Sequence, residues 1–305
     1  MGGSGKTPLV IWLVRHLIAQ GYRPGIVARG YGGRAPSYPR VVTPGSRPEL
    51  CGDEAVDLAQ QTGVPVVVSP DRSHARRWLQ EMLFCELAVS DDGLQHYAMN
   101  RQLEILVVNA RRGFGNEQLL PAGPLREPLA RLSEVDLIVL MTNELTRQDA
   151  AAEAEFSSLT ARVQQFALDT PIISCRMKIA GLTNGTTGER VDITQMKKIG
   201  KRHSRWVAVT GIADARSFHA SLIGVGVEFE RCAFADHHAY GAEDLLPFRG
   251  AGVLTTTKDA VKIRQLMRTN DALHDLDIWV LERTIELDAH AQQRLDSLIA
   301  TRVAK

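Results

Sequence analysis

The sequence predicts an α/β protein in which a parallel sheet flanked by helices is joined by a β-hairpin linker to a second, smaller α/β domain. Three observations predict this fold. A glycine-rich N-terminal segment runs directly into an apolar helix, and short apolar strands alternate with helical segments in the first half. A turn-rich stretch then precedes a second series of strands and helices. We expect the core at residues 1–172, the linker at 173–192 and the second domain at 193–305.

The N-terminal segment matches the second half of a P-loop. Consecutive glycines let backbone N–H groups surround phosphate oxygens, while Lys6 would contact the β- and γ-phosphates and the Thr7 hydroxyl would hold Mg²⁺. The N-terminus of the following helix adds partial positive charge at the same point. Nucleotide binding is therefore predicted for Gly2, Gly3, Ser4, Gly5, Lys6 and Thr7. The alternative is an ordinary glycine-rich helix start.

The helix expected at residues 7–20 follows from apolar residues that recur with helical spacing between Leu9 and Leu17. Pro8 suits a first helical turn, and Gly21 suits the end of a helix. A complete P-loop also follows a buried strand, and the first glycine of its motif would fall before the first residue. We therefore expect a P-loop kinase type of core that lacks its first strand.

The remaining elements follow from apolar runs and turn signals. Almost wholly apolar runs such as VPVVVS are typical of strands buried on both faces, and Asn-Gly and Thr-Gly pairs predict a hairpin within the linker. In the first half, strands are expected at 24–29, 64–69, 87–90, 104–109 and 136–141, and helices at 54–61 and 71–82. In the second half, strands are expected at 206–210, 227–233, 253–256 and 278–281, and helices at 214–223, 243–248 and 258–267.

Composition excludes several classes of protein. The 305 residues are 44% hydrophobic and carry a formal net charge of +1, which gives no nucleic-acid-binding signature. The cysteines are widely spaced, so the sequence suggests neither a zinc site nor a disulfide framework, and a reducing cytosol fits best. Neither a bilayer-spanning run nor a signal peptide is evident in the sequence.

Two adjacent aspartates follow the strand expected at 87–90. In P-loop proteins, a strand that ends in aspartate helps to hold Mg²⁺ beside the phosphate loop. Asp91 and Asp92, followed by Gly93, are therefore candidate metal ligands. The alternative is an ordinary turn.

Asp53 and His237 are the candidates for proton transfer. Asp53 precedes a predicted helix, so it either caps that helix or takes a proton from an attacking hydroxyl. His237 lies in an Asp-His-His run with one neighbouring carboxylate, which argues against a dedicated zinc site. It is either a structural or solvated surface residue, or Asp236 or His237 meets Asp53 across an interdomain cleft, where a histidine would tune the proton affinity of the carboxylate or orient it.

Two further features have open interpretations. Arg126 and Glu127 lie in a stiff, proline-rich loop that either binds phosphate or simply connects two elements. A basic cluster is either a solvated face or a contact with anionic lipid head groups; it consists of Lys197, Lys198, Lys201, Arg202 and Arg205.

These motifs together resemble one known family. The segments GGSGKTP, ARGYGG, GDEA, VPVVVSPDR, SDDGLQHY, FGNEQLLPAGPLREP, TGIADARSF, FADHHAY and TTKDAVK occur in the order found in the tetraacyldisaccharide 4′-kinase family of lipid A biosynthesis. The resemblance extends from Gly2 to about Trp279. SDDGLQH and LLPAGPLREP are its most specific parts.

The resemblance implies that the γ-phosphoryl group of ATP passes to the 4′-hydroxyl of an acylated disaccharide 1-phosphate, with Mg²⁺ present. It implies that Lys6 and Thr7 bind the nucleotide, that Thr7, Asp91 and Asp92 hold the metal, that Asp53 is the base and that His237 supports it. It also implies that His96, Arg126 and Glu127 lie in the active site. We expect a peripheral protein on the cytoplasmic face of the bacterial inner membrane, with neither nucleic acid nor an obligate protein as partner.

The sequence also departs from the family pattern. A membrane-associating segment and the first core strand are expected to be missing, which would leave a soluble cytoplasmic protein. The sequence has GDEA where the family has GDEP, and it has Thr257 where the family usually has a glutamate. Two alternatives therefore remain: a truncated fragment with impaired catalysis that binds nucleotide or lipid, and a P-loop kinase of a soluble substrate.

Overall fold

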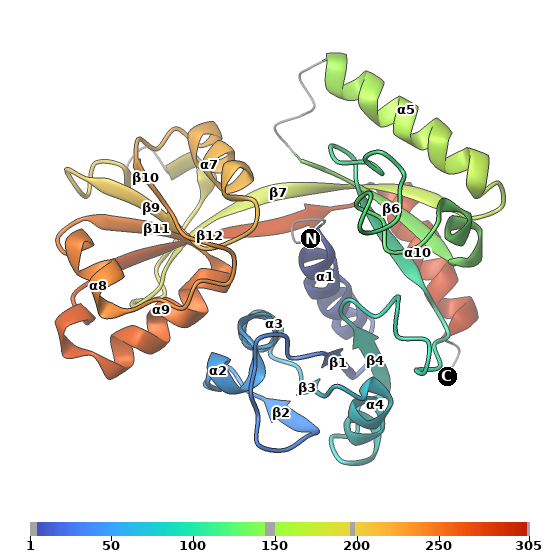
Figure 1. The fold of residues 1–305 in the computed structure, drawn as a ribbon, viewed down its shortest axis with the longest axis horizontal. Coiled ribbons are helices and arrows are strands. Elements are labelled where there is room, and N and C mark those ends of the chain that lie inside the picture. The colour runs from blue at the N-terminus through green and yellow to red at the C-terminus, as the bar shows by residue number, and fades with distance from the viewer. Residues whose placement is uncertain (1–4, 144–149, 196–198, 304–305) are drawn as a thin grey trace. The chain divides into compact units, whose positions relative to one another are not determined.

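The computed structural model describes residues 5–143, 150–195 and 199–303, which form two compact units (Figure 1). Unit 1 contains Leu9–Gly93 and the described part of Ile179–Thr284. Unit 2 contains residues 5–8 and the described parts of Leu94–Lys178 and Ile285–Lys305. The units group residues by contact rather than by chain order, so the domain boundaries predicted from the sequence stay a prediction.

The first sheet of unit 1 has the strand order β2-β3-β1-β4. Strands β1 (Pro24–Ala28), β3 (Val66–Val68) and β4 (Leu87–Ser90) are parallel and lie where the sequence predicts strands. Strand β2 (Arg40–Val42) was not predicted and pairs antiparallel with β3. It is an edge strand of only three residues, too short to show an alternating pattern.

Helices cover both faces of this sheet. Side chains alternate along a strand, so Ile26 and Ala28 pack with apolar residues of helices α1 (Lys6–Ala19) and α3 (Asp53–Thr62). Val27, on the opposite face, packs with helix α4 (Arg72–Glu81). The short helix α2 (Pro48–Cys51) directly precedes α3. This arrangement explains why the strands have continuous apolar sequences.

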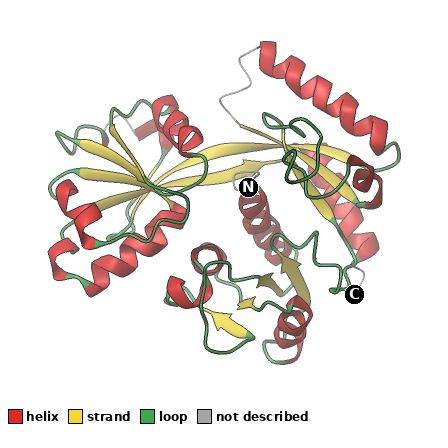
Figure 2. Ribbon diagram, in the orientation of Figure 1, coloured by secondary structure: helices red, strands yellow, loops and turns green. Residues whose placement is uncertain are grey.

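The second sheet of unit 1 is parallel, in the order β10-β9-β11-β12. Its strands are β9 (Trp206–Thr210), β10 (Glu230–Ala233), β11 (Gly252–Thr256) and β12 (Asp277–Glu286). Trp206 and Ala208 pack with helix α7 (Ala215–Gly224) on one face. Val207 and Val209 pack on the other face with helices α8 (Ala242–Leu245) and α9 (Thr257–Thr269), so helices flank this sheet too (Figure 2).

The predicted hairpin is present in unit 1. Strand β7 (Ile172–Asn184) ends there and pairs antiparallel with β8 (Arg190–Val191). The Asn184 side-chain oxygen accepts hydrogen bonds from the N–H groups of Thr186 and Thr187 at 3.0 and 2.8 Å. This side chain therefore closes the turn that the Asn-Gly pair predicts.

Unit 2 contains a parallel arrangement of β5 (Ile105–Asn109), β6 (Leu137–Asn143) and the first part of β7. Its core contains Val108, Ile138 and Leu140 from the strands and Leu159 and Val163 from α5 (Ala150–Phe166). The last helix, α10 (Ala289–Arg302), and α5 were not predicted. None of the described helices is long and apolar enough to cross a membrane.

Within unit 1, helix α9 packs against helix α3, about 200 residues earlier in the chain. Val261 of α9 joins the core of the first sheet. The Thr257 hydroxyl donates to Asp57 Oδ2 at 3.2 Å, and the Gln265 amide donates to Glu49 Oε2 at 2.9 Å. The contact therefore places the start of α9 beside the start of α3, where Asp53 lies.

Asp57 makes this contact sensitive to pH. Burial raises its pKa from 3.8 to about 6, although hydrogen bonds from Gln61 and Thr257 oppose the shift. The folded protein therefore holds this proton more tightly than the unfolded chain does. The free energy of unfolding consequently falls as the pH rises through this range, and the cost of ionised Asp57 is fully present above it.

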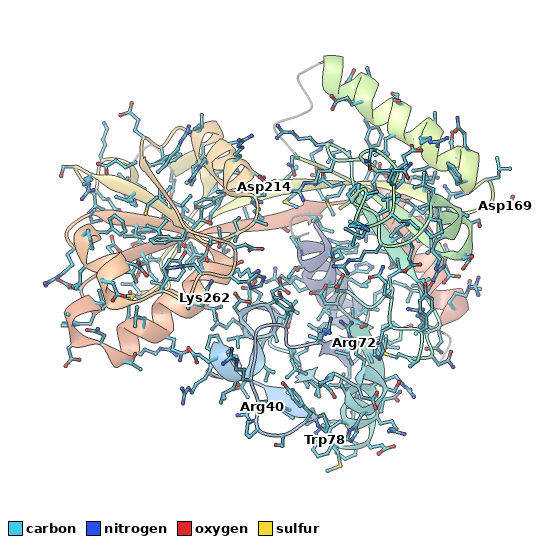
Figure 3. All side chains as sticks on the ribbon, in the orientation of Figure 1. Arg40, Arg72, Trp78, Asp169, Asp214 and Lys262 are labelled. Atoms are coloured by element: carbon cyan, nitrogen blue, oxygen red, sulfur yellow. The ribbon has the colours of Figure 1, made fainter. Side chains whose placement is uncertain are left out.

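Asp57→Asn should remove this cost. We expect the variant to gain stability relative to the unsubstituted protein as the pH rises, by roughly 2 kcal/mol between about pH 4 and about pH 8. Urea unfolding midpoints at the two pH values measure the difference. The exposed Asp169, labelled in Figure 3, provides the matched Asp→Asn control. Equal pH dependence in all three proteins would contradict a raised pKa at Asp57.

Candidate active site

Asp53 follows a glycine whose backbone conformation suits no other residue. Gly52 has φ +84°, and a side chain at this position would collide with the carbonyl oxygen of Tyr31. The residue at the helix N-cap is Gly52, so Asp53 is the first helical residue rather than the cap. Its Oδ1 accepts a hydrogen bond from the Glu54 N–H at 2.9 Å. The Asp53 side chain is only 7% exposed.

His237 lies beside this carboxylate in unit 1. Its Nδ1 is 3.4 Å from Asp53 Oδ2, and the Tyr31 ring lies 5.1 Å from the imidazole between centroids. The backbone at His237 is left-handed, with φ +59°, and its N–H donates to the Gly211 carbonyl at 3.0 Å. The two residues that the sequence paired for proton transfer are therefore brought together, and their catalytic roles stay a prediction.

Two lysines of α9 complete this cluster, and the sequence analysis missed both. Lys258 and Lys262 are four residues apart, so they project from the same side of the helix. Lys258 Nζ lies 3.1 Å from His237 Nε2 and 3.1 Å from Glu54 Oε1. Lys262 Nζ, labelled in Figure 3, lies 3.6 Å from Asp53 Oδ2 and donates to the His238 carbonyl at 2.9 Å. Their i, i+4 spacing is visible in the sequence, but it does not distinguish them from the solvated lysines that helices commonly carry.

Asp259 fixes the loops around the cluster. It is fully buried, and its Oδ2 accepts hydrogen bonds from the Thr210 hydroxyl, the Gly211 N–H and the Thr256 hydroxyl at 3.0, 3.0 and 2.8 Å. Lys262 Nζ is 3.3 Å from its Oδ1. These bonds join the ends of β9 and β11 to the start of α9. The carbonyl of Gly211 in turn accepts the hydrogen bond from the His237 N–H. The Thr-Lys-Asp run is thus a structural junction.

The cluster places the ammonium groups of Lys258 and Lys262 next to the carboxylates of Glu54 and Asp53. Burial disfavours the charged form of Lys258, but the carboxylates of Asp53 and Glu54 outweigh this effect and raise its pKa. Lys258 is therefore an ammonium group at neutral pH. A buried carboxylate with a neighbouring imidazole and two cations can accept a proton from a hydroxyl while its negative charge stays compensated.

The paired aspartates lie at the end of β4, also in unit 1. The Asp91 N–H donates to the Val27 carbonyl at 3.1 Å, and Asp92 has φ +51°. The buried Arg72, labelled in Figure 3, donates to Ser90 Oγ at 2.9 Å and to the Asp91 carbonyl at 2.5 Å. Burial lowers the pKa of Arg72, while Asp92 and Asp91 act in the opposite direction.

This donor set suits Mg²⁺, which prefers carboxylate oxygens and is usually bound by one or two of them together with phosphates and water. Among the described residues, no group of three or more His, Cys, Asp or Glu side chains could hold a metal alone. The aspartates therefore suit a metal that arrives with a nucleotide better than a metal held in a closed protein site.

The described part of the P-loop segment begins at Gly5, in unit 2. Gly5 has φ +89°, and a side chain there would come within 2.8 Å of Met141 in β6 and 3.3 Å of Met177 in β7. Only glycine fits this position without displacing those methionines. Lys6 and Thr7 form the first turn of α1. Gly2, Gly3 and Ser4 lie outside the described residues, so their predicted roles stay predictions.

Arg126 and Glu127 lie in unit 2 among polar side chains. Arg126 Nη1 donates to Gln95 Oε1 at 3.1 Å. Glu127 Oε2 accepts a hydrogen bond from the Tyr97 hydroxyl at 2.7 Å and lies 3.3 Å from Arg131 Nε. These contacts give Glu127 a role in positioning its loop, and nucleotide binding by the pair stays a prediction.

Two arginines of the basic cluster, which was interpreted either as a solvated face or as a lipid contact, have carboxylate partners. Arg202 pairs with Glu189 at 2.5 Å, and Arg205 pairs with Glu230 at 2.8 Å. Lys197 and Lys198 lie outside the described residues. The described arginines thus form surface ion pairs, as expected of a solvated face.

A glycine-led helix start with Lys6 and Thr7, and paired aspartates at the end of a parallel strand, define an α/β phosphotransferase of the P-loop class. The comparisons with known proteins identify the family. Residues 1–303 match the family described as tetraacyldisaccharide-1-P 4′-kinase, and the chain belongs to this family.

Relatives agree with this assignment. The chain is 40% identical to tetraacyldisaccharide 4′-kinase of Nitrosococcus oceani over 299 residues, which cover 98% of the chain and 78% of the relative. It is 38% identical to the enzyme of Vibrio cholerae, with 96% and 77% covered. It also matches a crystal structure of LpxK from Aquifex aeolicus in complex with ATP, with a TM-score of 0.76 and 27% identity over 100% of this chain and 86% of that one.

Proposed function

We propose that this chain transfers the γ-phosphoryl group of ATP to the 4′-hydroxyl of tetraacyldisaccharide 1-phosphate in lipid A biosynthesis. The observation that carries the proposal is the Asp53–His237 pair, a buried carboxylate 3.4 Å from an imidazole at the start of a helix. Family membership and the names of the relatives support the substrate, and the ATP complex of the Aquifex aeolicus protein supports the nucleotide.

Lys6 and Thr7 bind the phosphates of ATP. The Lys6 ammonium group compensates the charge that develops on the transferred phosphoryl group, since phosphoryl transfer depends mainly on positioning and electrostatic stabilisation. Thr7, Asp91 and Asp92 hold Mg²⁺, which supplies further neutralisation of phosphate charge when bound. Arg126 assists phosphate binding, and Glu127 keeps the loop of Arg126 in place through Tyr97 and Arg131.

Asp53 is the general base. The 4′-oxygen of the lipid attacks the γ-phosphorus, the bond from that phosphorus to the bridging oxygen of ADP breaks, and the hydroxyl proton passes to Asp53. His237 orients the carboxylate through Oδ2, and Lys262 compensates its charge from 3.6 Å. The ionised form of Asp53 is the form that accepts the proton.

The substrate sets the location of the enzyme. An acylated disaccharide resides in a membrane, so the chain acts as a peripheral protein at the cytoplasmic face of the inner membrane. The reaction needs neither nucleic acid nor an obligate protein partner. The described residues contain no helix that could span a membrane.

Transfer of ³²P from [γ-³²P]ATP to tetraacyldisaccharide 1-phosphate in detergent micelles tests the proposal. We expect labelled lipid that depends on both the protein and Mg²⁺. A parallel reaction with a soluble glucosamine disaccharide 1-phosphate tests the main alternative, a kinase of a soluble sugar. Label in the soluble sugar alone would overturn the assignment of the lipid, and label in neither acceptor would overturn the kinase activity of this chain.

A further inference from the structure

The contact between Lys258 and His237 restricts where the imidazole carries its proton. Lys258 Nζ lies 3.1 Å from His237 Nε2, within hydrogen-bond distance. An ammonium group has donors only, so Nε2 must be the acceptor in this bond. A neutral imidazole that accepts at Nε2 carries its hydrogen on Nδ1. That nitrogen is the one that faces Asp53 Oδ2, at 3.4 Å.

We infer that Lys258 holds His237 as the neutral Nδ1–H tautomer, so that the protonated Nδ1 faces Asp53 and leaves Asp53 as the only proton acceptor of the pair. Lys258 is thus a positioning residue for the reaction. This inference rests on the proposed function for its catalytic meaning, whereas the tautomer is a property of the protein alone.

The surroundings of Lys258 keep it in this position. Its side chain is 17% exposed, and Glu54 Oε1 accepts a second hydrogen bond from Nζ at 3.1 Å. The pKa of Lys258 is raised despite its burial, because the carboxylates of Asp53, Glu54 and Asp236 lie nearby. The lysine therefore stays charged over the pH range in which an imidazole titrates.

Removing this cation should change the protonation of His237. The lone pair of Nε2 would become available, and Asp53 would favour the imidazolium form because of its opposite charge. An imidazolium paired with Asp53 would lower the basicity of that carboxylate. Several groups around His237 act on the protonation of its imidazole. They are Asp53 and Glu54 from α3, Lys258 and Lys262 from α9, Tyr31 from the loop after β1, and Asp236 beside His237.

Lys262 does not duplicate this role. It donates to the His238 carbonyl at 2.9 Å, lies close to Asp259 and Asp53, and is 5.2 Å from the centroid of the Tyr240 ring, so none of these contacts is with the His237 imidazole. The inference therefore distinguishes two lysines that share one side of one helix.

The first test is ¹⁵N NMR of the imidazole of His237 in the unsubstituted protein, with the signal assigned by its absence in His237→Gln. We expect an unprotonated Nε2 and a protonated Nδ1 between about pH 6 and about pH 8. A proton on Nε2 in this range, in either the neutral or the charged imidazole, would overturn the inference. This measurement needs no substrate, so it remains decisive even where lipid phosphorylation fails.

The second test compares Lys258→Met with Lys258→Arg in the pH dependence of kcat. In the methionine variant, we expect the acid limb to move upward to about pH 6.5 or above, with a loss of about fourfold or more at pH 6 relative to the plateau. Arginine still donates a charged hydrogen bond and should restore the original limb. Lys178→Met, which removes an ion-paired lysine of unit 2, is the control for losing a lysine.

A purely structural role for Lys258 predicts a different result. It would lower kcat equally at all pH values and would leave the acid limb where it is. An unshifted limb in Lys258→Met, or the same shift in Lys258→Arg, would therefore contradict the inference.

Discussion

Asp53→Asn is expected to lower kcat for lipid phosphorylation by about 1,000-fold, which corresponds to about 4 kcal/mol of transition-state stabilisation. Asparagine keeps the size of the side chain and can still interact with the Glu54 N–H and with His237. It cannot accept the proton of the attacking hydroxyl. The KM for ATP should remain nearly unchanged, because Asp53 acts on the acceptor rather than on the nucleotide.

Helix α3 offers a matched control for this variant. Asp57 lies one turn after Asp53 and is also buried, but it bonds to Gln61 and Thr257 instead of His237. Asp57→Asn should therefore retain nearly full kcat. Steady-state kinetics with labelled ATP measure both variants. A loss in Asp53→Asn that is confined to KM for ATP would reassign Asp53 to the nucleotide site, and equal losses in both variants would point to a general disturbance of α3.

Strands that are buried at every residue are readily predicted from the sequence. Strands β3 and β9 are buried at every residue, so their apolar runs stand out from the polar segments around them. Strand β2 has one buried residue of three, and its short exposed pattern resembles a loop. Helix α5 is an unpredicted element, although its sequence is rich in alanine and glutamate, which favour helices.

The residues of the candidate site also differ in whether the local sequence identifies them. Asp53 and His237 could be selected because a carboxylate at a helix start and a histidine after a strand have chemistry that is visible in the local sequence. Lys258 and Lys262 could not, since a lysine on a helix is usually a solvated residue. Their position depends on the packing of α9 against α3, which joins segments about 200 residues apart. Local patterns carry no information about that contact.

The role of Asp259 likewise could not be predicted from its local sequence. In the structure, this aspartate joins Thr210, Gly211 and Thr256 at the ends of two strands. A buried carboxylate that accepts hydrogen bonds from a backbone N–H and two hydroxyl groups stabilises the loops that carry those donors. These donors come together only in the folded sheet.

Lys6→Ala is expected to reduce kcat/KM for ATP by at least about 1,000-fold, again about 4 kcal/mol. The reason differs from that for Asp53. The γ-phosphoryl group carries its charge on three equatorial oxygens in the transition state, and an ammonium group at the start of α1 compensates part of that charge. Because this interaction strengthens as the transition state forms, kcat should fall more than ATP affinity.

Binding and turnover must be measured separately to test this prediction. Titration with a fluorescent ATP analogue gives nucleotide affinity, single-turnover transfer of ³²P to the lipid gives the chemical step, and circular dichroism checks that the variant is folded. We expect a folded variant with a modest loss of affinity and almost no transfer. Lys178→Met, in the same unit but in an ion pair with Glu286, controls for loss of a positive charge and should retain transfer. Transfer by Lys6→Ala above about a tenth of the original rate would show that the segment before α1 is an ordinary glycine-rich helix start, since a P-loop lysine cannot be removed at so small a cost.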